Sequence, residues 1–167
     1  MATVRQSSNE WRAGCPIAMQ GPTGMSKVYL ANSPVDRKLD GLGACTPQLQ
    51  ELISSFMPMA WHLIDKLELD SDRSLHIFYV NPHETIENNA KRLLDFFYGM
   101  SGNNHVFMPL SPSHVTIVHS LKEILSSDHR LLLDKVPFLY IGDSANKPVM
   151  ENLANQLGMP FYFQAYY

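Results

Sequence analysis

The stretch that decides the fold is VPFLYIGDSANKPVMENLANQLGMPFYF, residues 136–163. Its first apolar run, VPFLYI (136–141), has the length and composition of a buried strand and ends at the Gly-Asp-Ser of residues 142–144. A helical pattern follows over 148–157, and a second apolar run, PFYFQAY (160–166), comes after it. A strand, a helix and another strand in this order are typical of a parallel sheet whose connections are helices.

The same rhythm occurs twice more upstream. LHIFYV (75–80) precedes a helical pattern over 84–98, and HVFMPL (105–110) precedes one over 113–125. These runs lack a clean alternation of apolar and polar residues, which is typical of strands that are buried on both faces. The sequence therefore predicts an α/β fold of three layers, Rossmann-like or flavodoxin-like. We expect a mostly parallel sheet of about five strands, with helices on both faces and right-handed crossovers throughout.

The N-terminal part of the chain is less regular. Residues 1–26 contain scattered glycines and prolines and predict an irregular arm, which leaves 27–167 as a single α/β domain. KVYLA (27–31) predicts a first strand. Residues 46–69 predict a helix, and we expect Pro58 to kink or split it, because proline lacks the N–H that the helical ladder needs.

Composition limits the classes of function. The chain has 167 residues, of which 45% are hydrophobic and 17% charged, and its net charge is −3. We therefore expect neither nucleic acid nor an anionic membrane as a partner. No apolar run is long enough to span a bilayer, and the first residues lack the apolar core of an export signal, so we expect a cytoplasmic protein. Cys15 and Cys45 suit a reduced protein as well as one disulfide.

Known cofactor and metal motifs are missing. The chain has no G-x-G-x-x-G motif, no P-loop and no closely spaced Cys or His pair, so it predicts no cofactor and no metal site. Two H-x-T stretches occur, at His83 and His114. Two-histidine phosphoesterases use such a pair as general acid and base. Both stretches fall at predicted helix starts here, and we interpret them as capping residues.

Short polar segments follow the predicted strands, where ligands bind in open parallel sheets. Asn81, Ser111 and Ser144 stand in these segments and are candidates for ligand contacts. Asp143 is a candidate to bind a sugar hydroxyl or to act as a base. Glu151 lies one turn into the next helix and is a second catalytic candidate. Asn, Ser and Asp are also common at helix starts and turns, so a capping or turn role stays open for the first four residues, and Glu151 can equally be an exposed carboxylate of its helix.

From residue 75 to residue 163 the order of features resembles the nucleoside 2-deoxyribosyltransferase-like group. The resemblance rests on the stretches IFYVNPHET, IENNAKRLLDFF, HVFMPLSP, FLYIGD and MENLANQLGMP. It covers about half of the chain. It implies a pocket for a nucleoside or nucleotide and chemistry at an N-glycosidic bond, in which Glu151 would be the nucleophile and Asp143 would hold the sugar.

Two hypotheses about function follow. The first is a small cytoplasmic α/β domain that binds a nucleotide- or nucleoside-like ligand at its strand ends and cleaves or transfers at an N-glycosidic bond. The alternative is a non-enzymatic protein–protein interaction module, or a subunit of a larger assembly, that uses residues 1–26 and an aromatic C-terminus. That aromatic group comprises Phe161, Tyr162, Phe163, Tyr166 and Tyr167. Nine methionines and few charges favour a homo-oligomer or a complex with a partner protein.

Overall fold

The structure is a computed structural model, and it describes residues 28–32, 47–67, 74–100, 105–126 and 136–166. The predictions for the arm (1–26), for Cys15 and Cys45, and for Tyr167 lie outside these residues.

Five parallel strands form one sheet in the order β1-β2-β3-β4-β5. They are β1 (Val28–Ala31), β2 (Ser74–Tyr79), β3 (His105–Leu110), β4 (Phe138–Gly142) and β5 (Phe161–Ala165). The helices among the described residues are α2 (Pro47–Lys66), α3 (Ile86–Tyr98), α4 (His114–Leu125) and α5 (Lys147–Leu157), with the short 3-10 turn η2 (Ser144–Asn146) before α5.

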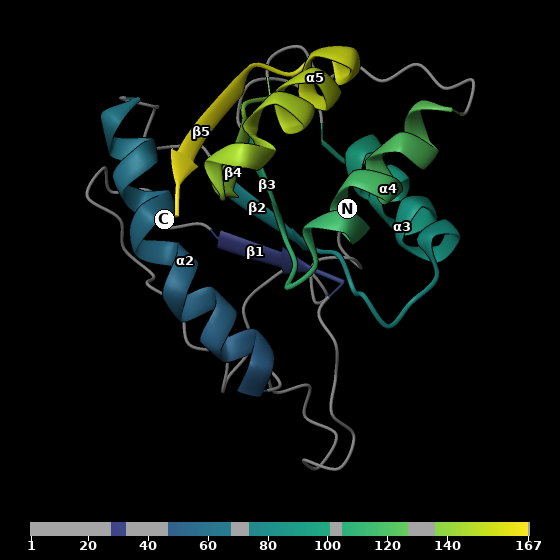
Figure 1. The fold of residues 1–167 in the computed structure, drawn as a ribbon, viewed down its shortest axis with the longest axis horizontal. Helices are drawn as coiled ribbons and strands as arrows, with labels where there is room; N and C mark the ends of the chain where they lie inside the picture. The colour runs from purple at the N-terminus through teal and green to yellow at the C-terminus, as the bar shows by residue number, and fades with distance from the viewer. Residues whose placement is uncertain (1–27, 33–46, 68–73, 101–104, 127–135, 167) are drawn as a thin grey trace.

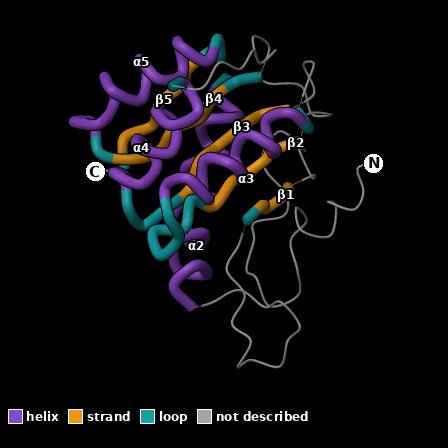
Figure 2. The backbone as a smooth tube through the Cα atoms, turned by 90° about the vertical axis from the view of Figure 1, so that its right-hand side faces the viewer, coloured by secondary structure: helices purple, strands orange, loops and turns teal. Residues whose placement is uncertain are grey.

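Helices cover both faces of the sheet. α3, α4 and α5 pack on one face, where their buried side chains meet Phe107 and Phe138 of the strands. α2 packs on the other face, against Val106 and Ile141 among others. Figure 1 shows α2 on the opposite side of the sheet from α3 and α4, and Figure 2 shows α3, α4 and α5 together on one side. The predicted three-layer α/β fold with a parallel sheet is confirmed.

The first crossover has an unexpected hand. Strand order follows sequence order, so the chain always steps across the sheet in the same direction. When steps share a direction, the hand of a crossover depends only on the face that its helix covers. α2 covers the face opposite to α3, α4 and α5, so the crossover β1–α2–β2 is opposite in hand to the other three. The prediction that all crossovers are right-handed is therefore wrong.

Burial of the second face gives a physical reason for this exception. Among the described helices, only α2 covers the face that carries Leu75, Ile77 and Met108, all of which are fully buried. Without α2 these side chains would lie in water, and burying one such side chain is worth about 1.5–3 kcal/mol. Burial of many such residues outweighs the preference for a right-handed connection.

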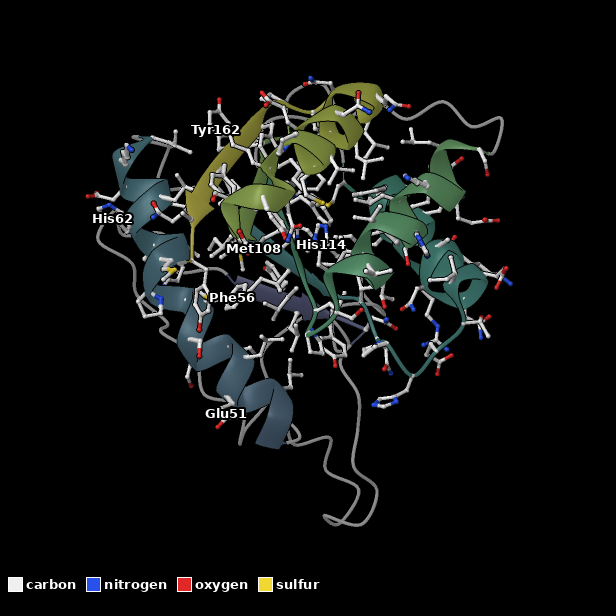
Figure 3. The ribbon with its side chains drawn as sticks, viewed as in Figure 1. Glu51, Phe56, His62, Met108, His114 and Tyr162 are labelled. Atoms are coloured by element: carbon white, nitrogen blue, oxygen red, sulfur yellow. The ribbon has the colours of Figure 1, made fainter. Side chains whose placement is uncertain are left out.

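The sequence predicted that Pro58 would kink or split this helix, and α2 runs through Pro58 without a break, so no split occurs. A proline at this position deprives the carbonyl of Ser54 of its helical partner. Both Ser54 and Pro58 are exposed, so water can satisfy that carbonyl. Figure 3 shows Phe56 on the sheet side of α2, and Glu51 and His62 on its outer side. The apolar contacts of the sheet side hold the helix together across the proline.

Candidate functional site

The carboxyl ends of the strands form one edge of the sheet, because all five strands are parallel. The connection after β1 leads to α2 on one face, and the connection after β2 leads to α3 on the other. Ligands of open α/β sheets bind where neighbouring connections diverge in this way. A ligand site is therefore expected at the neighbouring ends of β1 and β2.

Two asparagines join the ends of β1 and β2. Asn32 follows β1 directly and has a φ of 63°, the left-handed conformation that asparagine adopts more readily than most residues. Its Nδ2 donates to the carbonyl of Tyr79 at 2.8 Å. Asn89 of α3 is fully buried, donates from Nδ2 to the carbonyl of Asn81 at 2.8 Å, and accepts from the backbone N–H of Asn81 at 3.0 Å. These bonds fix the turn after β2 to α3.

Arg92 completes this group, which we call the Asn32–Arg92 cluster (Asn32, Asn81, Asn89 and Arg92). Its Nη1 donates to Oδ1 of Asn32 at 2.9 Å. The side chain of Arg92 is exposed, and it forms no ion pair with any residue that the structure describes. A guanidinium has five N–H donors in a rigid fork, and the described residues use one of those of Arg92.

A second polar group lies at the ends of β3 and β4, and we call it the Tyr140 group (His114, Tyr140 and Asn146). The Tyr140 hydroxyl lies 2.8 Å from Nδ1 of His114 and accepts from Nδ2 of Asn146 at 3.3 Å. Figure 3 shows His114 between the start of α4 and the strands. Burial raises the pKa of Tyr140, and burial also lowers the pKa of His114 below its usual 6.5. At pH 7 both side chains are therefore neutral.

The Tyr140 group explains the glycine at position 142. A Cβ at Gly142 would lie 2.6 Å from the hydroxyl of Tyr140 and 2.8 Å from its ring. These distances are too short for any real contact, so a side chain at position 142 would displace the phenol. The absence of a side chain at Gly142 thus makes room for the phenol ring of Tyr140.

Four of the five predicted site residues lie where the strands end and take part in local turn structure. Asp143 is exposed and accepts the backbone N–H of Ala145 at 2.9 Å, which makes it the N-cap of η2. Ser144 is exposed and begins η2. The remaining two are also turn acceptors: Oγ of Ser111 accepts from Ser113 at 3.1 Å, and Oδ1 of Asn81 accepts from His83 at 2.9 Å.

Glu151 lies apart from these residues. It belongs to the exposed side of α5, whereas its neighbours Met150 and Leu153 are buried in the core. Its carboxylate makes no hydrogen bond or ion pair with the described part of the chain. Asp143 and Ser144 stand together at η2, and no hydrogen bond or ion pair joins Glu151 to them in this part. The nucleophilic role of Glu151 stays a prediction.

Sequence analysis missed several residues of these two groups. One signal was available for Asn89, because it stands between Ile86 and Leu93 on the inward stripe of its helix, where a polar residue indicates a buried hydrogen bond. His114 was assigned to capping through its H-x-T stretch. Tyr140 carried no signal, since a tyrosine in an apolar strand does not show where its hydroxyl ends. Asn32 and Arg92 also carried no signal, because they lie 60 positions apart.

Other features of the described residues are less suggestive. A shallow, open depression of about 350 Å³ lies between α3 and α4. Its lining residues are Ile86, Glu87, His119, Lys122, Glu123 and Ser126. Within the described ranges, no group of three or more His, Cys, Asp or Glu residues is placed to hold a metal ion, and no helix is long and apolar enough to cross a membrane.

Comparisons with known proteins add no relative to this geometry. The chain was compared with protein-family models, with curated proteins and with solved structures, and none of the three comparisons found a match.

Proposed function

We propose that the protein binds a nucleotide- or nucleoside-like ligand at the carboxyl edge of its sheet. The observation that carries this proposal is the exposed guanidinium of Arg92, which is held by Asn32 at the point where the connections of β1 and β2 diverge. Arginine pairs with phosphate through two parallel N–H···O bonds, so a fixed guanidinium at this point favours a phosphate-bearing ligand.

The frame around Arg92 supports the proposal. Asn32 is held in its left-handed conformation by the bond to Tyr79, and the turn after β2 is held by the buried Asn89. A guanidinium that is already oriented loses less conformational entropy when a ligand binds. Structural strain of this kind, at a non-glycine residue with positive φ, also occurs more often at functional sites than elsewhere.

The rest of the ligand would extend toward β3 and β4. Neighbouring strands are about 5 Å apart, so the Tyr140 group lies roughly 10 Å from the Asn32–Arg92 cluster along the edge. A sugar and base attached to the phosphate would reach Asp143, the residue expected to hold the sugar, and Ser144, a candidate for contacts with the ligand. Cleavage or transfer at an N-glycosidic bond is the reaction that this resemblance suggests.

Binding of mononucleotides tests the proposal. We expect AMP, and adenosine more weakly, to raise the melting temperature of the protein, since a ligand at one hundred times its Kd stabilises the folded state by about 2.7 kcal/mol. Arg92→Gln should weaken AMP binding in titration calorimetry by roughly ten-fold or more. Lys91→Gln is the matched control, because Lys91 is the neighbouring exposed cation on α3.

The proposal is contradicted if no nucleoside, nucleotide or NAD shifts the melting temperature. It is also contradicted if Arg92→Gln and Lys91→Gln lose AMP binding equally, or if Arg92→Gln binds AMP as tightly as the unchanged protein. Hydrolysis is tested separately, by following release of free adenine from adenosine and AMP. In that assay Asp143→Asn and Glu151→Gln should each abolish the reaction if the roles implied by the resemblance are correct.

A protein-interaction module is the second candidate, and β5 favours it. β5 is an edge strand of the described sheet, and all five of its residues are half-buried. Phe161 and Phe163 pack on one core cluster, and Tyr162 and Tyr166 on the other, so these aromatics serve the core as well as the surface. The backbone of Tyr166 donates to Gly142 of β4, so its neighbour Ala165 directs its N–H to the open edge. Sedimentation equilibrium distinguishes the candidates, because an edge used for assembly gives a concentration-dependent mass that Ala165→Pro should abolish.

A further inference from the structure

We propose that His114 contacts the ligand, and that it donates a hydrogen bond from Nε2–H to an acceptor oxygen while Tyr140 holds its ring in the required tautomer. This inference rests on the proposed function for its location at the carboxyl edge. It adds a ligand-contacting residue and the ligand chemistry that this residue recognises. The acceptor would be a phosphate or sugar oxygen of the ligand.

The first step concerns the proton of the Tyr140 hydroxyl. Tyr140 is only 4% exposed, so its hydroxyl must find its partners inside the protein. Nδ2 of Asn146 donates to the phenol oxygen and therefore cannot take its proton. Nδ1 of His114, at 2.8 Å, is the remaining partner in the described part of the chain. The hydroxyl therefore donates to Nδ1.

The opposite arrangement leaves a buried donor without an acceptor. If Nδ1 of His114 carried the proton, the phenol oxygen would accept from both His114 and Asn146, and its own O–H would point at neither. An unsatisfied buried donor costs about 1–3 kcal/mol. This cost selects the tautomer in which Nδ1 is bare.

The second step follows from the neutral charge of the ring. Burial lowers the pKa of His114, so the imidazole carries one proton at pH 7. Since Nδ1 is bare, that proton sits on Nε2. Nε2 makes no hydrogen bond with the described residues, and His114 is only half-buried. An oriented donor without a partner among the described residues thus stands at the start of α4, at the edge where the strands end.

The charges around this donor favour a neutral or singly charged acceptor oxygen at that point. Asp143 lies near enough to Tyr140 to contribute to its raised pKa, and Lys147 of α5 sits over the ring of Phe163 at 5.6 Å. Phe163 in turn stacks on Tyr140 at 6.1 Å. One carboxylate and one ammonium group thus flank the Tyr140 group, and their charges offset each other.

Nitrogen NMR of the imidazole side chains tests the tautomer without any ligand. We expect His114 of the intact protein to show a protonated Nε2 and a bare Nδ1 at pH 7.5. Tyr140→Phe keeps the ring but removes the hydroxyl, so this variant should shift His114 toward a mixture of tautomers while the fold is retained. A protonated Nδ1 in the intact protein would overturn the proposal.

Titration with AMP and with inorganic phosphate tests the contact. The Nε2–H resonance of His114 should move on addition of AMP, and His114→Gln should raise the Kd for AMP by roughly ten-fold. His119→Gln is the matched control, because His119 is an exposed histidine of the same helix and should leave the Kd unchanged. Movement with phosphate as well would identify a phosphate oxygen as the acceptor, and movement with AMP alone would identify another oxygen of the nucleotide.

The outcomes separate this inference from the proposed function. AMP binding that depends on Arg92 but leaves both the His114 resonance and the His114→Gln affinity unchanged would overturn the inference alone. The absence of binding by any nucleoside or nucleotide would overturn the proposed function and the ligand contact with it. Nitrogen NMR would determine the tautomer of His114 whether or not a ligand binds.

Discussion

His76 shows how burial changes the chemistry of a single residue. It lies on β2, where its Nε2 is 2.9 Å from Nδ1 of His105 on the neighbouring strand. Its ring stacks on Tyr29 with centroids 5.0 Å apart, and the edge of Phe96 approaches it at 6.0 Å. Burial, and then the charge of His105, lower the pKa of His76 to about 3.

The lowered pKa of His76 predicts a loss of stability in mild acid. In the unfolded chain the residue takes up a proton near its usual pKa of 6.5, whereas in the folded protein it stays neutral down to about pH 3. The contribution of His76 to the free energy of unfolding should therefore be fully present above pH 6.5. Between pH 6.5 and about pH 3 the free energy of unfolding should fall by about 1.4 kcal/mol per pH unit. Urea unfolding at several pH values measures this slope.

A substitution isolates the contribution of His76. His76→Phe keeps an aromatic ring between Tyr29 and Phe96 and should flatten the slope below pH 6.5. His62→Gln, which changes an exposed histidine of α2, should leave it intact. An unchanged slope in His76→Phe would assign the acid sensitivity to other groups.

Gly142 allows a second prediction at this scale. Gly142→Ala should push the Tyr140 phenol away from His114 and Asn146, because the new Cβ would fall 2.6 Å from the hydroxyl. We expect destabilisation of about 1–3 kcal/mol by thermal unfolding and a change in the imidazole signals of His114. Gly99→Ala is the control, since a Cβ there meets nothing closer than 3.4 Å. A cost equal to that of the control would show that the phenol moves freely.

At the scale of elements, the sequence predicted which segments are helices and strands better than where they pack. β3 was placed at its exact bounds, and β2 to within one residue, because their apolar runs end at Pro or polar residues. The face that α2 covers was not predictable. An apolar stripe shows that a helix is buried, but it does not specify which side of a sheet buries it.

Pro58 gives a prediction about α2. Pro58→Ala should restore the hydrogen bond to the Ser54 carbonyl and stabilise the protein by about 1–3 kcal/mol, because proline is about 3 kcal/mol worse than alanine inside a helix. Chemical denaturation measures the gain. Ser54→Ala, an exposed change on the same helix, should have a much smaller effect. A loss of stability in Pro58→Ala would mean that the proline ring contributes essential packing.

The buried asparagine of α3 gives another prediction. Asn89→Ala removes the bonds that hold both backbone groups of Asn81 and leaves those partly buried groups without the partner that Asn89 provides. We expect a cost of about 2–4 kcal/mol in chemical denaturation, together with weaker AMP binding, since the frame of Asn32 is loosened. Asn88→Ala changes the exposed neighbour of Asn89 and should cost less than about 1 kcal/mol. Similar costs in the two variants would contradict the role given to Asn89.

At the scale of the whole molecule, the location of the candidate site was predictable and its composition was not. Four strand–helix units and a final strand suffice to predict a parallel sheet, and a parallel sheet suffices to predict a ligand site along the edge where the strands end. The hydrogen bonds that define the site join Asn32 to Arg92 and His114 to Tyr140. Such partners are far apart in the sequence, and only the completed strand register brings them together.

Hydrogen exchange should reflect this architecture. β2, β3 and β4 each have a neighbouring strand on both sides, and their core residues are buried. We expect their amides to exchange only through global unfolding, and those of β1 and β5 to exchange through smaller local openings. Mass spectrometry of peptides from native-state exchange measures both classes. Equal protection of β1 and β3 would indicate that the edge strand is held by contacts beyond its pairing with β2.

The position of α2 has a consequence for protein synthesis. Its apolar side packs against β4 and β5, which the ribosome makes long after α2 has emerged. Translation adds about 5–20 residues per second, so this side stays uncovered for several seconds or longer on a nascent chain. Ile53, Met57 and Ile64 are then accessible to a chaperone that binds apolar helices. Productive folding therefore requires that α2 does not aggregate with other molecules before the C-terminal strands are synthesised.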